Sequence, residues 1–67
     1  MNIFVNNNSE KLVDTRILSA LLKQLNLIEK QGIAVAVNNE VVLKTKWNEH
    51  ELKENDRITI IKATQGG

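Results

Sequence analysis

The sequence closes on two glycines, and the carboxylate of the second is the group best placed to do chemistry. Gly66 and Gly67 are two of only three glycines among 67 residues, the third being Gly32, so the pair does not follow from composition. A carboxylate becomes an electrophile only after activation, commonly as an acyl-adenylate, inside an enzyme that admits the chain end. Glycine has no Cβ and permits the close backbone approach that a narrow channel requires. The pattern therefore predicts that Gly67 is a substrate for another enzyme.

The single histidine, His50, is the other candidate for acid–base or metal chemistry. It lies between Glu49 and Glu51 in a polar stretch. A nucleophilic site needs a base beside a Ser, Cys, Thr or Lys nucleophile, and a zinc site needs three or four ligands. Polar stretches without a motif usually form surface loops. We therefore expect an exposed loop histidine, and we predict neither a catalytic residue nor a metal site in the chain.

Trp47 could be a stacking platform for a base or a sugar, or it could fill the core. Surfaces that stack bases usually carry several aromatic residues in a basic groove, whereas this sequence holds one tryptophan and one phenylalanine. We expect Trp47 to pack in the core, with its indole N–H bound to a hydrogen-bond acceptor.

Composition narrows the class of protein further. A chain of 67 residues supports one small core. It contains no cysteine, which excludes a thiol nucleophile and thiolate ligands. The net charge of +1 comes from scattered residues and does not suggest a nucleic-acid-binding surface. The N-terminus does not resemble a signal peptide, and no apolar run approaches the roughly 20 residues that span a bilayer. We expect a cytoplasmic protein that binds neither nucleic acid nor membrane.

A stripe of leucines predicts one helix. They recur at i, i+3, i+4 and i+7, the spacing of one buried helical face. The helix should run from about Arg16 to Leu25 or a few residues beyond, with Asp14 or Thr15 as its N-cap and Gly32 ending the connection that follows. The stripe consists of Leu18, Leu21, Leu22 and Leu25.

Short apolar segments separated by asparagine-rich turns predict strands on both sides of this helix. The predicted strands are residues 2–5, 11–13, 32–38, 41–43 and 57–62, with turns at 6–9, 38–39 and 54–56 and an irregular or single-turn segment at 47–52. This order predicts an α+β two-layer fold, in which one main helix covers one face of a mixed sheet of about five strands. Residues 1–62 should form a single domain, and residues 63–67 a flexible C-terminal tail.

The segment GIAVAVNNEVV at residues 32–42 resembles the central hairpin of the ThiS sulfur carriers of thiamine biosynthesis. The resemblance covers essentially the whole chain, and the predicted helix lies where that family has its helix. One departure is the turn Glu54-Asn55-Asp56, where the family often has Asp-Gly-Asp; asparagine also tolerates a left-handed backbone, so the fold is not put in doubt. The resemblance continues through Trp47, Leu52, Asp56, Arg57-Ile58, Ile60 and the ending Ala63-Thr64-Gln65-Gly66-Gly67.

The resemblance implies the β-grasp fold shared with ubiquitin, and a role as a protein co-substrate rather than an enzyme. In that family a ThiF-like adenylyltransferase consumes ATP to adenylate the C-terminal glycine, here Gly67, and no cofactor is held permanently. A cysteine desulfurase supplies sulfur, the terminus becomes a thiocarboxylate, and a ThiG-like thiazole synthase receives the sulfur. Gln65, Gly66 and Gly67 would thread into the active sites of these partners. Since the chain has no cysteine, it can carry sulfur only on its terminus.

Other functions remain open on the sequence. The chain could be the small subunit of molybdopterin synthase or a ubiquitin-like protein modifier, both of which use the same Gly-Gly terminus. It could also be a β-grasp interaction module that undergoes no terminal chemistry.

The β-grasp strand order implies which side chains face the helix. Ile3, Val5, Ile33, Val35, Val37, Ile58 and Ile60 should point toward it. The opposite face has no second helix to cover it, and an uncovered apolar strip is typical of a partner-binding surface. The residues predicted for this partner-binding face are Phe4, Ala34, Ala36, Thr59 and Ile61.

Overall fold

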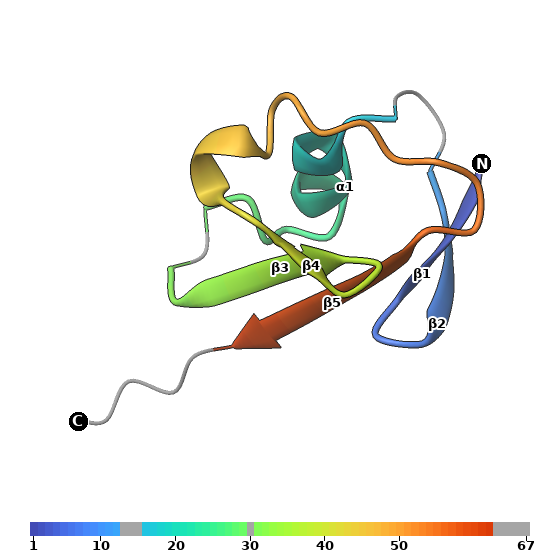
Figure 1. The fold of residues 1–67 in the computed structure, drawn as a ribbon, viewed down its shortest axis with the longest axis horizontal. Coiled ribbons are helices and arrows are strands. Elements are labelled where there is room, and N and C mark those ends of the chain that lie inside the picture. The colour runs from blue at the N-terminus through green and yellow to red at the C-terminus, as the bar shows by residue number, and fades with distance from the viewer. Residues whose placement is uncertain (13–15, 30, 63–67) are drawn as a thin grey trace.

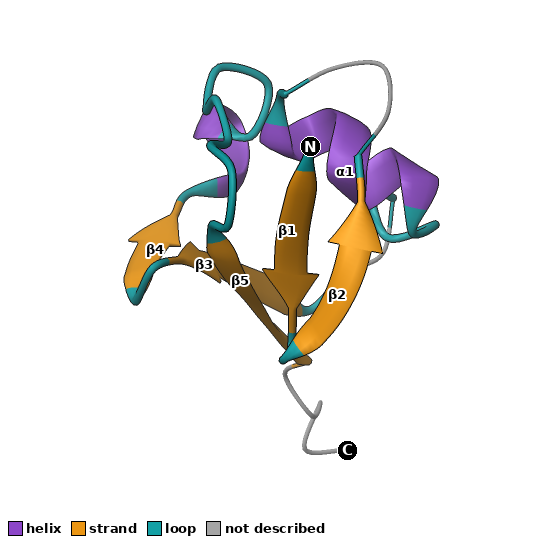
Figure 2. Ribbon diagram, turned by 90° about the vertical axis from the view of Figure 1, so that its right-hand side faces the viewer, coloured by secondary structure: helices purple, strands orange, loops and turns teal. Residues whose placement is uncertain are grey.

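A computed structural model describes residues 1–12, 16–29 and 31–62 and shows a five-stranded sheet with one α-helix. Both α1 and the short 3₁₀ turn η1 lie on the same side of the sheet (Figures 1 and 2). The predicted α+β two-layer architecture is thereby confirmed. The elements are β1 (Asn2–Val5), β2 (Asn8–Lys11), α1 (Leu18–Gln24), β3 (Ile33–Val37), β4 (Glu40–Val42), η1 (Lys44–Lys46) and β5 (Arg57–Lys62).

The last strand lies at the centre of the sheet. The strand order is β2-β1-β5-β3-β4. Strand β5 runs parallel to β1, with Val5 beside Ile58, and antiparallel to β3, with Val35 beside Ile60. This is the β-grasp connectivity implied by the resemblance, and it places the strand that precedes the C-terminal tail between two hydrogen-bonded neighbours.

Two asparagine pairs form the hairpin turns. Asn6 and Asn7 join β1 to β2, and Asn38 and Asn39 join β3 to β4; all four have positive φ, between 49° and 72°. Positive φ at both central residues is the geometry of the two-residue type I′ hairpin turn. Because the first turn uses only two residues, β2 begins at Asn8, so the predicted strand at 11–13 was wrong in its position.

The helix is shorter than predicted, and its N-terminus is capped in another way. Ile17 occupies the N-cap position and makes no side-chain capping bond. The predicted caps, Asp14 and Thr15, lie outside the described residues. The loop before β5 supplies acceptors instead: the N–H of Leu18 donates to the His50 carbonyl at 2.9 Å, and the next N–H donates to the Trp47 carbonyl at 3.0 Å. Helix-terminal donors are therefore satisfied by a distant loop.

The core lies between α1 and the sheet. The prediction that Trp47 packs there is confirmed, because its side chain is buried and its Nε1 donates to the Val42 carbonyl at 3.0 Å. Residues 47–52, predicted to be irregular or a single turn, lie outside the helices and the five strands, and η1 directly precedes them. No helix in the three described ranges is long and apolar enough to cross a membrane. The buried hydrophobic side chains are Ile3, Val5, Leu12, Leu18, Leu21, Leu22, Val35, Ala36, Val37, Trp47, Leu52 and Ile58.

Candidate functional site

The predicted reactive end of the chain follows directly on the central strand. The tail predicted at 63–67 lies outside the described residues, including Gly67 and the predicted threading residues Gln65 and Gly66, and the strand that leads to it is β5. Lys62 is the last residue of β5 and lies opposite Ile33 of β3. The chain is thus held in the sheet up to five residues before Gly67.

Asn6 holds the last part of β5 after β1 has ended. Its main-chain N–H donates to the Ile58 carbonyl at 2.9 Å. Its carboxamide binds β5 two residues further on. Oδ1 accepts from the Ile60 N–H at 2.9 Å, and Nδ2 donates to the Ile60 carbonyl at 3.4 Å. The side chain therefore replaces a strand residue and ties down β5 two residues before its end.

The residues predicted for the uncovered sheet face alternate along the strands as expected. Ala34 lies opposite Ile61, and Ala36 lies opposite Thr59. Ile61 is 55% exposed, and Ala34 and Thr59 are also exposed, whereas Phe4 is half-buried. Whether this face binds a partner stays a prediction.

Ala36 is a correction to that prediction, because its side chain is only 8% exposed. It lies on the uncovered face, but the register places it between Val41 of β4 and Thr59 of β5. Those longer side chains flank its single methyl group. Ala36 therefore contributes little surface of its own.

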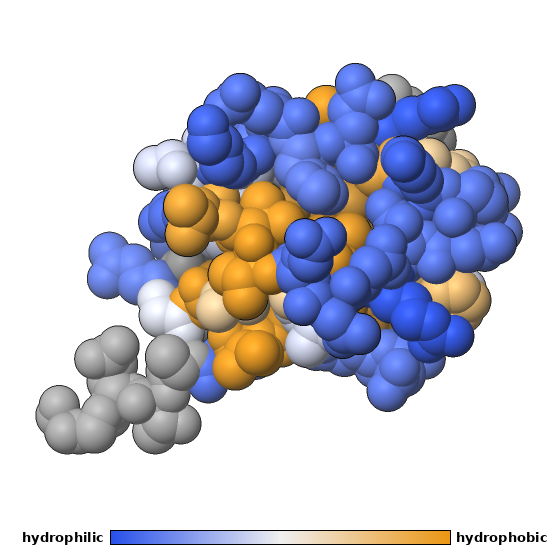
Figure 3. Space-filling view, viewed as in Figure 1, coloured by the Kyte–Doolittle hydropathy of each residue, from blue (hydrophilic) through white to orange (hydrophobic). Residues whose placement is uncertain are grey.

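Two exposed apolar residues of the same region were missed from the sequence. Val41 is 68% exposed and Leu43 is 65% exposed, more than Ile61. Val41 lies opposite Ala36, so it continues the uncovered face onto the edge strand. Figure 3 shows the apolar atoms gathered on the side of the molecule that carries β4 and the end of β5. In the predicted hairpin Val41 lies across from Ala36, and this pairing could have revealed that Val41 belongs to the uncovered face.

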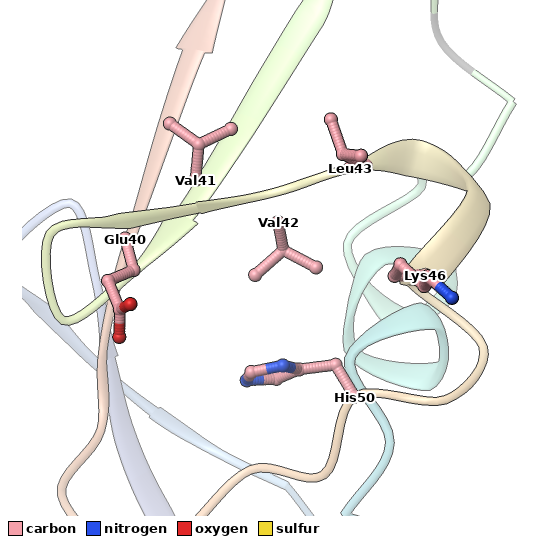
Figure 4. Close-up of a pocket in the computed structure, with 6 residues that line it drawn as sticks. All are labelled: Glu40, Val41, Val42, Leu43, Lys46 and His50. Atoms are coloured by element: carbon pink, nitrogen blue, oxygen red, sulfur yellow. The ribbon is translucent and has the colours of Figure 1, made fainter.

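An open hollow of about 350 Å³ lies beside β4 (Figure 4). His50 borders it, and its main chain is tied down because its N–H donates to the Lys46 carbonyl at 3.0 Å. His50 is half-buried rather than exposed as predicted. In the described ranges no group of three or more His, Cys, Asp or Glu side chains could hold a metal. The hollow is lined by Glu40, Val41, Val42, Leu43, Lys46 and His50.

Comparison with known proteins gives one consistent result. The family model described as the ThiS family matches residues 3–67. The chain belongs to the ThiS family. It is 27% identical over 67 residues to the sulfur carrier protein ThiS of Escherichia coli (strain K12), and the match covers 100% of both chains. Among the functions left open by the sequence, the ThiS family of sulfur carriers is therefore the one supported, in preference to a modifier or a plain interaction module.

Solved structures support the β-grasp fold of this ThiS family member. The crystal structure of the thiamine biosynthesis protein ThiS from Geobacter metallireducens superposes with a TM-score of 0.82, at 22% identity and with 100% of both chains covered. A solution NMR structure of a thiamine biosynthesis protein from the same organism gives a TM-score of 0.77, also at 22% identity, covering 100% of this chain and 88% of the other.

Proposed function

We propose that the protein carries sulfur as a thiocarboxylate on Gly67 for the thiazole ring of thiamine. The observation that carries this proposal is the family match, which extends to residue 67 and so includes the closing Gly66-Gly67. The relative from E. coli is named a sulfur carrier protein and aligns over its full length, which supports the same use of the terminus.

The proposed chemistry needs three partners and no permanently bound cofactor. A ThiF-like enzyme joins the Gly67 carboxylate to the AMP part of ATP, with release of pyrophosphate. A desulfurase converts cysteine to alanine and holds the sulfur as a persulfide, whose terminal sulfur attacks the acyl carbon as AMP leaves. A thiol then reduces the resulting acyl disulfide to the thiocarboxylate. In net terms, carboxylate, ATP, cysteine and two thiols give thiocarboxylate, AMP, pyrophosphate, alanine and a disulfide. A ThiG-like thiazole synthase finally accepts the sulfur.

The chain supplies positioning to this reaction sequence. Strand β5 lies between β1 and β3, so the lead to the terminus starts from the most constrained strand of the sheet. The side-chain bonds of Asn6 to Ile60 hold β5 close to its end. A short, side-chain-free end on a rigid base reduces the conformational entropy that a partner enzyme must remove in order to orient the carboxylate.

The first test is mass spectrometry of the intact protein after incubation with ATP, a ThiF-like enzyme, a desulfurase and cysteine. We expect one oxygen to be replaced by sulfur, located at Gly67 by fragmentation. Deletion of Gly67 should abolish pyrophosphate release. The matched control is Lys53→Ala, which alters an exposed residue in the loop before β5, at the opposite end of that strand from the terminus. Pyrophosphate release by the deletion variant at the rate of the unaltered protein would disprove the proposal.

A further inference from the structure

The uncovered sheet face carries cations and no carboxylate among its strand positions. In the described strands, the charged residues that alternate onto this face are Lys11 of β2 and Arg57 of β5. The acidic strand residues have the opposite orientation, because Glu10 lies opposite Ile3 and Glu40 opposite Val37, both of which are core residues. The face therefore combines exposed apolar side chains with positive charge.

Arg57 is held in place on this face. Its Cζ lies 5.2 Å from the centroid of the Phe4 ring, the distance of a cation–π contact. Its main chain is bound to Asn38 on both sides: the Arg57 N–H donates to Oδ1 at 3.0 Å, and the Arg57 carbonyl accepts from the Asn38 N–H at 2.7 Å. The ring and the turn together limit the positions that the guanidinium can adopt.

The guanidinium has no anionic partner within the part of the chain that the structure describes. The one ion pair found there joins Lys46 and Glu49, whose N and O atoms are 3.8 Å apart. Arg57 is exposed, so its N–H groups remain available to another molecule. A planar guanidinium binds a carboxylate through two parallel hydrogen bonds, and a side chain that is already oriented loses less entropy in doing so.

The charge pattern selects the occupant of this face. A second copy of the chain that used the same face would bring no strand carboxylate to Arg57 and would add like charges. Nucleic acid would require a longer basic stripe than Lys11 and Arg57 provide. The occupant that matches this face is another protein. Its surface would offer an Asp or Glu carboxylate to Arg57 and apolar side chains to Ile61 and Val41.

We propose that Arg57, oriented by Phe4, is the charged anchor of the interface with the activating enzyme and pairs there with an Asp or Glu carboxylate. The identity of that enzyme rests on the function proposed above. Arg57 acts in recognition of the partner and not on the reacting carboxylate of Gly67.

The test measures ATP-dependent pyrophosphate release by the ThiF-like enzyme as a function of carrier concentration. Arg57→Glu should raise the KM for the carrier by about tenfold or more, since one partner of a charge pair is inverted, with a smaller change in kcat. Arg57→Lys should give a KM between those of the unaltered chain and Arg57→Glu, because the charge is kept and the bidentate geometry is lost. Phe4→Leu should raise KM about two- to fivefold through loss of the ring that orients Arg57.

Lys23→Glu is the matched control, because it makes the same change in net charge on the exposed side of α1. An equal rise in KM for Lys23→Glu and Arg57→Glu would reduce the effect to general electrostatic steering and overturn the inference. Arg57→Gln serves as a second variant, in which the charge of Arg57 is removed and not inverted. Urea unfolding of each variant establishes that the variant is folded. If no pyrophosphate is released with the unaltered chain, the proposed function fails. If pyrophosphate is released and Arg57→Glu has the same KM as the unaltered chain, only the proposed role of Arg57 is wrong.

Discussion

At the scale of single residues, asparagine takes the role that glycine often has in small folds. Every non-glycine residue with positive φ in the described part of the chain is an asparagine. A glycine would adopt this backbone more easily, but it offers no side-chain hydrogen bonds. Two of these residues use their carboxamides to bind β5, Asn6 at Ile60 and Asn38 at Arg57. The turns thus hold the central strand as well as reverse the chain.

The prediction at this scale concerns Asn38. Its Oδ1 accepts from the Arg57 N–H, and its Nδ2 donates to Asp56 Oδ1 at 2.9 Å. Asn38→Gly keeps the positive φ but removes both bonds, so the free energy of unfolding should fall by about 2 kcal/mol. Asn39→Gly is the control, because it introduces the same glycine flexibility where no side-chain bond is made. Equal urea midpoints for the two variants would contradict this role of the carboxamide.

At the scale of elements, the loop between β4 and β5 organises its surroundings. It supplies the carbonyls that cap α1 and buries Trp47, whose indole N–H binds the Val42 carbonyl of β4. This one segment, which includes η1, therefore links the helix to the edge strand. The position of α1 depends on this loop, since Ile17 provides no side-chain cap.

Trp47→Phe tests that linkage. The substitution removes the indole hydrogen bond and leaves a smaller ring in a buried site, so we expect a loss of about 1–3 kcal/mol in the free energy of unfolding. Hydrogen exchange should also accelerate at the Leu18 and Ser19 amides, whose acceptors lie in this loop. Exchange that accelerates uniformly over all amides would instead indicate global destabilisation without a specific role for the loop.

At the scale of the whole molecule, the two faces of the sheet have separate roles. One face forms the core under α1, and the other presents Val41 and Ile61 at one end and Arg57 over Phe4 at the other. Apolar side chains gathered on an uncovered face are typical of a contact with another protein, and that role stays a prediction for this face. This uncovered face includes residues of β5, the strand that ends five residues before the proposed reactive Gly67.

Neighbouring positions of β5 allow these roles to be separated. Ile61 is exposed, so Ile61→Asp should change the free energy of unfolding by no more than about 0.5 kcal/mol while weakening binding to the ThiF-like enzyme. Ile58, at 1% exposure, packs in the core, and Ile58→Asp should unfold the protein because it buries a charge. Urea unfolding and calorimetric titration give the two readouts. Undiminished affinity of Ile61→Asp would exclude this face as the interface.

Much of the fold was predictable because its signals are local. The leucine spacing located α1, the β-branched alternation located β3 and β5, and the paired asparagines located the turns. The β-grasp strand order implied by the resemblance indicated which side chains of β3 and β5 face the helix. The absence of cysteine and the closing Gly66-Gly67 indicated the chain end as the reactive group.

Other features depend on contacts between segments far apart in the chain, so they follow from the three-dimensional structure and not from local patterns. The capping of α1 by loop carbonyls could not be predicted, because the acceptors come from residues about 30 positions away. The exposure of Val41 and the burial of Ala36 depend on what lies beside each of them in the assembled sheet. Arg57 meets Phe4 only because β5 lies parallel to β1. The proposed reactive end and most of the elements before it could be read from local sequence patterns, whereas the pairing of distant strands sets which side chains a partner would meet.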